Sequence, residues 1–356
     1  MTTSASRVTD ALGITHPIIQ APMAGGTTTP ALVAAVAEAG GLGSIGAGYL
    51  SPAAVTEAIA ETRARTARPF AVNLFIPQPF TADATRIDRA NGHLDAFRAE
   101  LGLSRPDTPA RYAPDFEDQF EAVIEAGVPV FSFTFGALDA ARIQRLQAAG
   151  TCVVGTATTV VEARHLEATG VDMIVAQGAE AGGHRGTFLG DAADGLVGTM
   201  ALVPQVVDAV SVPVIASGGI MDGRGMAAAR MLGAEAVQMG SAFLACDESG
   251  AKPAHKQAVL VAGDTPTAVT RAFSGKPARG LRNRFIDTLG PFEHELPDYP
   301  VQNAWTKDIR ATAGARDRPE FMSLWAGQAA GMARAESAGA LVARLAADLE
   351  AHWTRR

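Results

Sequence analysis

Short apolar runs recur along the chain, and each is followed by a longer segment with helical spacing. Most of the runs have four or five residues and are apolar almost throughout, as expected of strands that are buried on both faces. We predict eight strands, at Pro17–Gln20, Leu42–Ile45, Phe70–Leu74, Pro129–Phe133, Thr151–Val154, Met173–Gln177, Pro213–Ala216 and Ala236–Met239.

The segments between these runs carry helix start and stop signals. Thr29 and Pro30 supply an N-cap and a proline at the first helical position, and Gly40-Gly41 marks the end of that helix. Comparable signals occur at Ser51-Pro52, at the capping-box pattern from Thr159 to Glu162, and over Met226 to Leu232.

Eight strands that alternate with helical crossovers predict a (β/α)8 TIM barrel in the α/β class. An open, doubly wound sheet is the second possibility, but the first strand is not followed by GxGxxG. The spacing leaves one wide gap after the third strand. We expect an excursion from the barrel there, at Pro77–Asp118, and no motif in it indicates a function.

The chain continues after the eighth strand for longer than one closing helix requires. The segment from Lys252 to Arg318 differs in character, with clustered basic residues and a Pro-Asp-Tyr-Pro stretch. We therefore predict a smaller, α-rich, substrate-capping domain at residues 246–331, which lies over the barrel mouth. Residues 1–245 and 332–356 would form the barrel, with Gly331–Trp353 as a helix that returns to it.

Composition narrows the class of protein. The 356 residues are 47% hydrophobic and 19% charged, and the net charge is -7, so the chain is globular and gives no reason to expect nucleic acid or an anionic membrane as partner. Cys152 and Cys246 form no CxxC pair, which argues against a disulfide framework or a metal site. Without a signal-peptide pattern or an apolar run of about 18 residues, we expect a cytoplasmic enzyme.

Polar residues follow several of the predicted strands, where barrel enzymes carry their active sites. Met23 lies in a glycine-rich turn after the first strand, and Asn73 and Gln177 end the third and sixth strands. The two amides offer hydrogen-bond donors and acceptors to a ligand at the barrel mouth.

One histidine stands out by its context. His184 follows Gly182 and Gly183 in the loop after the sixth strand. The glycines permit positive φ and remove side-chain bulk beside a ring. We predict that His184 is catalytic.

Glycine-rich turns also follow the last two strands, where barrels often hold a phosphate. The residues concerned are Gly218 and Gly219 after the seventh strand, and Gln238, Met239, Gly240 and Ser241 at the eighth. The glycine-rich turn at Met23 and the amides of Asn73 and Gln177 suit a flat ring system. Together, these features predict a ligand with a phosphate tail and a flat head.

FMN fits these features better than other cofactors. A nicotinamide dinucleotide would call for a Rossmann fingerprint, and pyridoxal phosphate would call for a lysine at a strand end; neither is present. We expect the FMN phosphate on the last two turns and the isoalloxazine over Met23, Asn73 and Gln177.

At this point the sequence resembles a known family. The stretches APMAGG, AVNLF, AQGAEAGGHRGTF, PVIASGGI and VQMGSAFL occur in this order and resemble class I nitronate monooxygenases, with weaker agreement in DYPVQNAW. The resemblance implies an FMN barrel that oxidises alkyl nitronates, such as propionate 3-nitronate, with O2 to a carbonyl compound and nitrite. It implies flavin contacts at Asn73, Gln177, Gly182, Gly219 and Gln238 to Ser241, and it makes His184 the catalytic histidine. Ser241 departs from the expected threonine but keeps the hydroxyl.

The chemistry leaves two roles open for His184. As neutral imidazole it could accept a proton from a nitroalkane, and as imidazolium it could anchor the nitronate anion; an ordinary pKa near 6.5 permits both. Tyr299 and Lys307 are candidates to hold a substrate carboxylate. The expected partners are the nitronate and O2 only, with no metal, nucleic acid or membrane, and with a possible homodimer.

Three other functions remain open. A flavin enoyl-thioester reductase using NAD(P)H would have a similar barrel and glycine-histidine loop. An inosinate-type dehydrogenase would share the glycine turns, but neither cysteine is placed as its nucleophile. A non-catalytic flavin-binding barrel would need no histidine chemistry.

Overall fold

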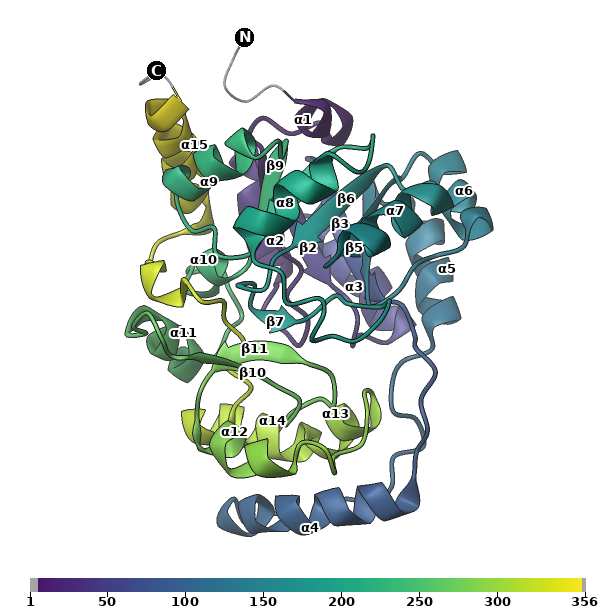
Figure 1. Ribbon diagram of the computed structural model, residues 1–356, viewed down its shortest axis with the longest axis vertical. Helices are drawn as coiled ribbons and strands as arrows, with labels where there is room; N and C mark the ends of the chain where they lie inside the picture. Colours follow the sequence, from purple (N-terminus) through teal and green to yellow (C-terminus); the bar gives the residue numbers. More distant parts are fainter. Residues whose placement is uncertain (1–5, 354–356) are drawn as a thin grey trace.

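Eight parallel strands form a closed barrel in the computed structural model, which describes residues 6–353 (Figure 1). The strands are β1 (Ile18–Gln20), β2 (Gly43–Gly46), β3 (Phe70–Phe75), β4 (Val130–Thr134), β5 (Cys152–Ala157), β6 (Met173–Gln177), β8 (Val214–Ser217) and β9 (Ala236–Met239). They pair in the order β1-β9-β8-β6-β5-β4-β3-β2, and a parallel bridge between Ile19 and Leu42 joins the two ends. Every predicted strand is present, and the predicted (β/α)8 barrel is confirmed.

Helices follow the strands around the outside of the barrel. They are α2 (Pro30–Glu38), α3 (Pro52–Arg63), α5 (Phe116–Ala126), α6 (Ala140–Ala148), α7 (Val160–Thr169), α8 (Thr199–Val207), α9 (Gly223–Met231) and α15 (Ala338–Trp353). The predicted start of α2 is confirmed, because the Thr29 hydroxyl accepts the Leu32 N–H at 3.0 Å. Alternating strands and helices therefore bury one large apolar core between the two layers.

The N-terminal helix α1 (Arg7–Leu12) covers the end of the barrel where the strands begin. Val8 and Leu12 pack into a cluster with residues from the starts of the strands, such as Ile19 and Val130. This end of the barrel is closed by apolar side chains, which leaves the opposite end for a site.

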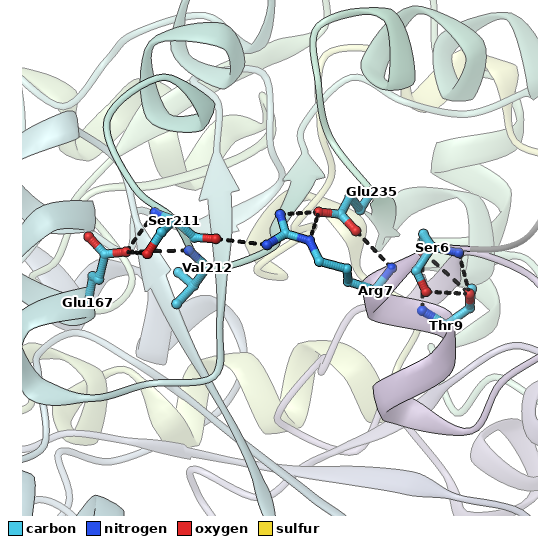
Figure 2. Close-up of polar contacts among 7 residues, drawn as sticks. All are labelled: Ser6, Arg7, Thr9, Glu167, Ser211, Val212 and Glu235. Atoms are coloured by element: carbon cyan, nitrogen blue, oxygen red, sulfur yellow. Dashed lines mark hydrogen bonds and ion pairs between the residues drawn. The ribbon is translucent and has the colours of Figure 1, made fainter.

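Polar contacts tie α1 to the loops beneath the barrel (Figure 2). The Arg7 guanidinium donates to the Glu235 carboxylate and to the Ser211 carbonyl, each at 2.8 Å. The Ser211 N–H and hydroxyl in turn donate to Glu167 at 2.6 Å. These exposed contacts align α1 with the loops that precede β8 and β9, although each adds little stability by itself.

A small antiparallel sheet lies at the other end of the barrel. Its strands are β10 (Thr267–Thr270), β11 (Ala278–Leu281) and β7 (Gly183–His184), in the order β10-β11-β7. The surrounding helices are α10 (Ser241–Leu244), α11 (Pro253–Leu260), α12 (Arg284–Leu289), α13 (Val301–Trp305) and α14 (Lys307–Ala315), with 3-10 turns at Gly290–Phe292, Pro319–Phe321 and Ala330–Met332. The sheet was not foreseen, and it brings the loop after β6 into contact with residues from much later in the chain.

The predicted excursion carries a helix that packs away from the barrel. Figure 1 shows α4 (Ala84–Glu100) beyond α12 and α14. Phe97 lies 4.7 Å from Phe285 between ring centroids, and the buried Arg98 donates to Asp308 at 2.8 Å and to the Trp305 carbonyl at 2.7 Å. The division into two domains stays a prediction, but the apolar cluster of α4 consists mostly of residues from 246–331, joined by Leu244 from α10.

The returning C-terminal helix is shorter than predicted. α15 begins at Ala338, and the expected first turn near Gly331 is a 3-10 turn instead. The Ser337 hydroxyl caps this helix by accepting the Ala340 N–H at 3.2 Å. The alanine-rich pattern on both sides of Ser337 gave no sign of where the helix begins. Leu345 and Leu349 of α15 pack into the barrel core, as expected of a closing helix.

None of the helices at residues 6–353 is long and apolar enough to cross a membrane. Within the same range, no group of three or more His, Cys, Asp or Glu side chains is arranged to hold a metal ion.

Candidate active site

The predicted site residues lie at the C-terminal end of the barrel. Gln177 pairs with Ser217, and Ser217 pairs with Gln238, so these three side chains stand on adjacent strands at one level. Met239 pairs with Gln20 on the next strand. The register thus brings residues from the sixth, seventh and eighth barrel strands to a common edge.

His184 is held by the small sheet rather than by a free loop. Within β7, His184 pairs with Ala278 and Gly183 pairs with Arg279, both on β11. Gly183 has φ +75°, as predicted for a glycine at this position. The imidazole is therefore positioned by a strand that arrives from nearly a hundred residues later.

The Gln177 amide supports the backbone of the histidine loop. Its Nε2 donates to the His184 carbonyl at 3.1 Å, and its Oε1 accepts the Gly186 N–H at 2.8 Å. Arg185, which is fully buried, donates to the carbonyls of Gly178 at 2.6 Å and Gln177 at 2.9 Å. These hydrogen bonds hold the histidine loop against the end of β6.

Gly182 lies close to the backbone of a later segment. A Cβ at this position would lie 2.5 Å from both the Ala326 carbonyl carbon and the Gly327 nitrogen. This packing is one reason for a glycine here, and its predicted place beside a cofactor stays a prediction. The close approach brings residues 326–327 against the histidine loop, and Gln328 N–H donates to the Glu180 carbonyl there at 2.9 Å.

Three aromatic rings surround the His184 imidazole. Ring centroids of Phe135, Trp325 and Tyr299 lie 5.4, 5.5 and 6.1 Å from it. Phe135 follows β4 directly and has φ +78°, a strained conformation for a bulky residue that is found mostly at functional sites. We call His184 with these three residues the aromatic cluster.

Ser274 contacts the ring nitrogen of His184. Ser274 Oγ lies 2.8 Å from His184 Nε2 and 3.1 Å from the Lys276 carbonyl, and its single proton can go to only one of them. In the tautomer with the proton on Nε2, the hydroxyl donates to the carbonyl and Nδ1 has a free lone pair.

Burial, together with the positive charges of Lys276 and Arg310, lowers the pKa of His184 to about 3. The imidazole is neutral at physiological pH. The neutral imidazole is the form that can accept a proton, but the burial and positive charges that keep it neutral also oppose its protonation, so both roles left open by the sequence stay predictions.

Two tyrosines and two cations complete the surroundings of the cluster. Tyr49 and Tyr299 share a side-chain hydrogen bond, and burial raises the pKa of both, to about 12 for Tyr49. Arg310 donates to Asn303 and Thr306 on its own helical segment, and burial lowers its pKa. The tyrosines are therefore neutral donors, whereas the net charge near His184 is positive.

Tyr299 and Lys307, which were predicted together, are placed differently. Tyr299 belongs to the aromatic cluster, as the prediction requires. Lys307 begins α14 and is exposed, so its position lends the predicted carboxylate contact no support. The cations whose charges act on His184 are Lys276 and Arg310.

The glycine turns after β8 and β9 leave backbone donors unbonded. Gly218 and Gly219 have φ +118° and +71°. Among the described residues, no acceptor bonds the N–H of Gly219 or Gly240. Ser241 Oγ accepts the Gly327 N–H at 2.8 Å and so keeps its own proton available. Met239 is buried in the core, so only its backbone can reach a ligand.

Met23 and Asn73 line the same end of the barrel. A Cβ built on Gly240 would lie 4.0 Å from Met23 Sδ, which brings the first and last barrel strands together there. Asn73 is buried and its amide nitrogen donates to Ser132 Oγ at 2.9 Å. The Asn73 oxygen is the atom left for a ligand.

Several residues of the site escaped the sequence analysis. Phe135 could have been found, because it lies just after β4, at the end of the barrel where Asn73 and Gln177 were sought. Glu162 was read only as a capping residue, yet its buried carboxylate accepts the N–H groups of Phe188 at 2.5 Å and Leu189 at 2.9 Å. Tyr49 lies in the loop after β2 and could have been found by the same rule. The other residues come from segments late in the chain, and no local pattern predicts that these segments pack against the barrel: Ser274, Lys276, Arg310 and Trp325.

Known proteins resemble this chain over nearly its whole length. A probable nitronate monooxygenase of Staphylococcus saprophyticus is 45% identical over 339 residues, which are 95% of each chain. The structure of nitroalkane oxidase from Streptomyces ansochromogenes has a TM-score of 0.91 at 42% identity, over 98% of this chain and 99% of that one. FabK from Thermotoga maritima has a TM-score of 0.78 at 34% identity, over 98% of this chain and 97% of that one.

The family comparison agrees with these relatives. The family described as nitronate monooxygenase matches residues 5–348, which include the barrel, the histidine loop and the small sheet. The chain therefore belongs to the nitronate monooxygenase family of oxidoreductases.

Proposed function

We propose that this protein oxidises alkyl nitronates with O2 to a carbonyl compound and nitrite, with FMN as its cofactor. The observation that carries the proposal is a neutral His184 between aromatic rings and cations, next to the glycine turns at the C-terminal end of the barrel. The family of flavin-dependent oxidoreductases to which the chain belongs supports the same reaction class.

The residues present fit FMN. The unbonded N–H groups of Gly219 and Gly240, together with the Ser241 hydroxyl, are donors that suit a phosphate. The Asn73 oxygen and the Met23 side chain lie at the same barrel edge and suit the flat ring system. When bound, FMN would supply the electron-transfer chemistry, and the protein would supply position and field.

His184 would act on the substrate proton. Its Nδ1 lone pair can accept the α-proton of a neutral nitroalkane, while Ser274 holds the opposite nitrogen. A nitronate has already lost that proton and needs only to be bound. Tyr299 would contribute a neutral hydroxyl to the substrate; a role for Lys307 and a homodimer both stay predictions.

Aerobic nitrite release tests the proposal. Purified protein with bound flavin is mixed with a series of alkyl nitronates, without NADPH, and nitrite and carbonyl product are quantified. We expect both products. After the flavin has been removed, we expect the flavin absorbance spectrum of the protein to return only when FMN is added. Oxidation of NADPH with reduction of an enoyl thioester under anaerobic conditions, without nitrite release in air, would support the reductase hypothesis instead.

A further inference from the structure

The Lys276 ammonium lies next to the aromatic cluster. It lies between Ser274, which binds His184, and the strand β11, which pairs with His184. Its ammonium is 4.8 Å from the centroid of the Phe135 ring, which is itself 5.4 Å from the His184 ring. Lys276 therefore reaches the aromatic cluster from the side of the small sheet.

The ammonium has fewer partners than its burial calls for. Of its three N–H donors, one bonds the Thr187 carbonyl at 3.1 Å. Lys276 forms no salt bridge with any residue in the range 6–353. A half-buried cation without a counter-ion is costly, and cation–π attraction to Phe135 offsets only part of that cost.

Arg310 is the other cation near His184, and its hydrogen bonds stay within its own segment. Arg310 Nη2 donates to the Asn303 carbonyl at 2.7 Å and to its side-chain oxygen at 2.9 Å, and Arg310 Nε donates to Thr306 at 3.1 Å. Three of the five guanidinium N–H donors are thus used, against one of the three Lys276 donors, and the charge of Lys276 acts more strongly on His184 than that of Arg310 does. A nitronate is an anion with two oxygens that must be bound in this site.

We propose that the Lys276 ammonium binds the anionic nitronate group at the edge of the aromatic cluster, beside His184. This inference rests on the proposed function, because it assigns the group that recognises that reaction's substrate. The Thr187 carbonyl and the Phe135 ring orient the ammonium, and the substrate supplies the missing counter-charge. Lys276 is then a specificity-determining residue that favours nitronates over neutral nitroalkanes.

The charge of Lys276 depends on pH within an accessible range. Burial lowers its pKa to about 8; the charge of Arg271 adds to this effect, and the carboxylate of Glu162 opposes it. His184, the other titratable group facing it, is neutral throughout this range. Anion binding through Lys276 should therefore weaken as pH rises above about 8.

Binding of a small planar anion tests the proposal without turnover. Nitrate is titrated calorimetrically into the flavin-loaded wild type, Lys276→Met, Lys276→Arg, and Lys252→Met as an exposed-lysine control. We expect Lys276→Met to weaken nitrate binding at pH 7 by about tenfold or more, as for a lost charge-assisted hydrogen bond. Lys252→Met should bind as wild type does, and Lys276→Arg should retain binding up to pH 9.5, where the wild type loses it.

Kinetics give the second readout. Lys276→Met should raise KM for ethylnitronate by a similar factor and leave KM for neutral nitroethane nearly unchanged. Equal nitrate affinity in wild type and Lys276→Met, or an unchanged pH profile in Lys276→Arg, would overturn the proposal even if all variants release nitrite. Failure of the proposed function is distinct: the wild type would then release no nitrite from any nitronate, whatever its nitrate affinity.

Discussion

The Ser274 hydroxyl lies 2.8 Å from Nε2 of His184, across a sequence separation of 90 residues. The small sheet makes this contact possible, because β7 and β11 bring the two segments into register. When the serine hydroxyl donates to the Lys276 carbonyl, Nδ1 is the basic nitrogen of the imidazole. We therefore propose that Ser274 is a positioning residue for His184 as proton acceptor.

Replacement of Ser274 should affect substrates unequally. In Ser274→Ala the imidazole can take either tautomer, so we expect kcat for neutral nitroethane to fall about tenfold, the effect of one lost hydrogen bond. Ethylnitronate needs no deprotonation, and its turnover should change little. Steady-state kinetics with both substrates measure the split, and an equal loss with both would point to a purely structural role.

The acid sensitivity of the fold should reflect its neutral histidines. Burial lowers the pKa of His184 to about 3 and of His255 to about 4. In the unfolded chain both side chains are protonated near pH 6.5. Because the folded protein keeps them neutral, it loses no stability through these two groups above pH 6.5, and it becomes progressively less stable as pH falls toward 3 to 4.

Thermal unfolding between pH 7.5 and 4.5 measures this effect. His255→Gln should flatten the decline of melting temperature on the acid side, whereas replacement of the exposed His294 by Gln should leave it unchanged. A wild-type melting temperature that does not fall across this range would contradict the assignment of neutral buried histidines.

Gly182 should tolerate no side chain. In Gly182→Ala the Cβ meets backbone atoms of Ala326 and Gly327 at 2.5 Å, so the histidine loop and residues 326–327 must separate. We expect a destabilisation of about 1–3 kcal/mol in chemical unfolding, as for other overpacked positions. The control Gly92→Ala, within α4 and with nothing within 4 Å, should be neutral or stabilising.

The buried Glu162 should matter more for the histidine loop than for its own helix. Its carboxylate accepts N–H groups from Phe188 and Leu189, and also the Thr158 N–H at 2.6 Å. Glu162→Gln replaces one acceptor oxygen by a donor, so one N–H is left unsatisfied at a cost of about 1–3 kcal/mol. Limited proteolysis should detect earlier cleavage near residues 189–195; the exposed Glu57→Gln should cleave as wild type does.

The barrel could be predicted because its signals are local. Each strand is a short apolar run, and helix starts such as Thr29-Pro30 depend on neighbouring residues alone. The same rule, that function follows the ends of the strands, located Gln177, His184 and the glycine turns. It would also have found Phe135, had the residue after the fourth strand been considered.

The rest of the site depends on long-range pairing that no local pattern reveals. The two residues of β7 become a strand only because β11 lies beside them, and this pairing delivers Ser274 and Lys276 to His184. The excursion shows no functional motif because its helix α4 packs against residues 246–331. Phe97 lies in their apolar cluster, and Arg98 donates to the Trp305 carbonyl. Lys307, in contrast, matched the expected residue type but is exposed.

Nitrite release by His184→Gln tests the central claim most directly. Flavin-loaded wild type and variant are compared in air with neutral nitroethane, and flavin content is measured in both. The account predicts that wild type forms nitrite and that the variant loses about 10²- to 10⁴-fold in kcat/KM while it retains its flavin. A variant that holds flavin and turns over nitroethane at the wild-type rate would contradict it.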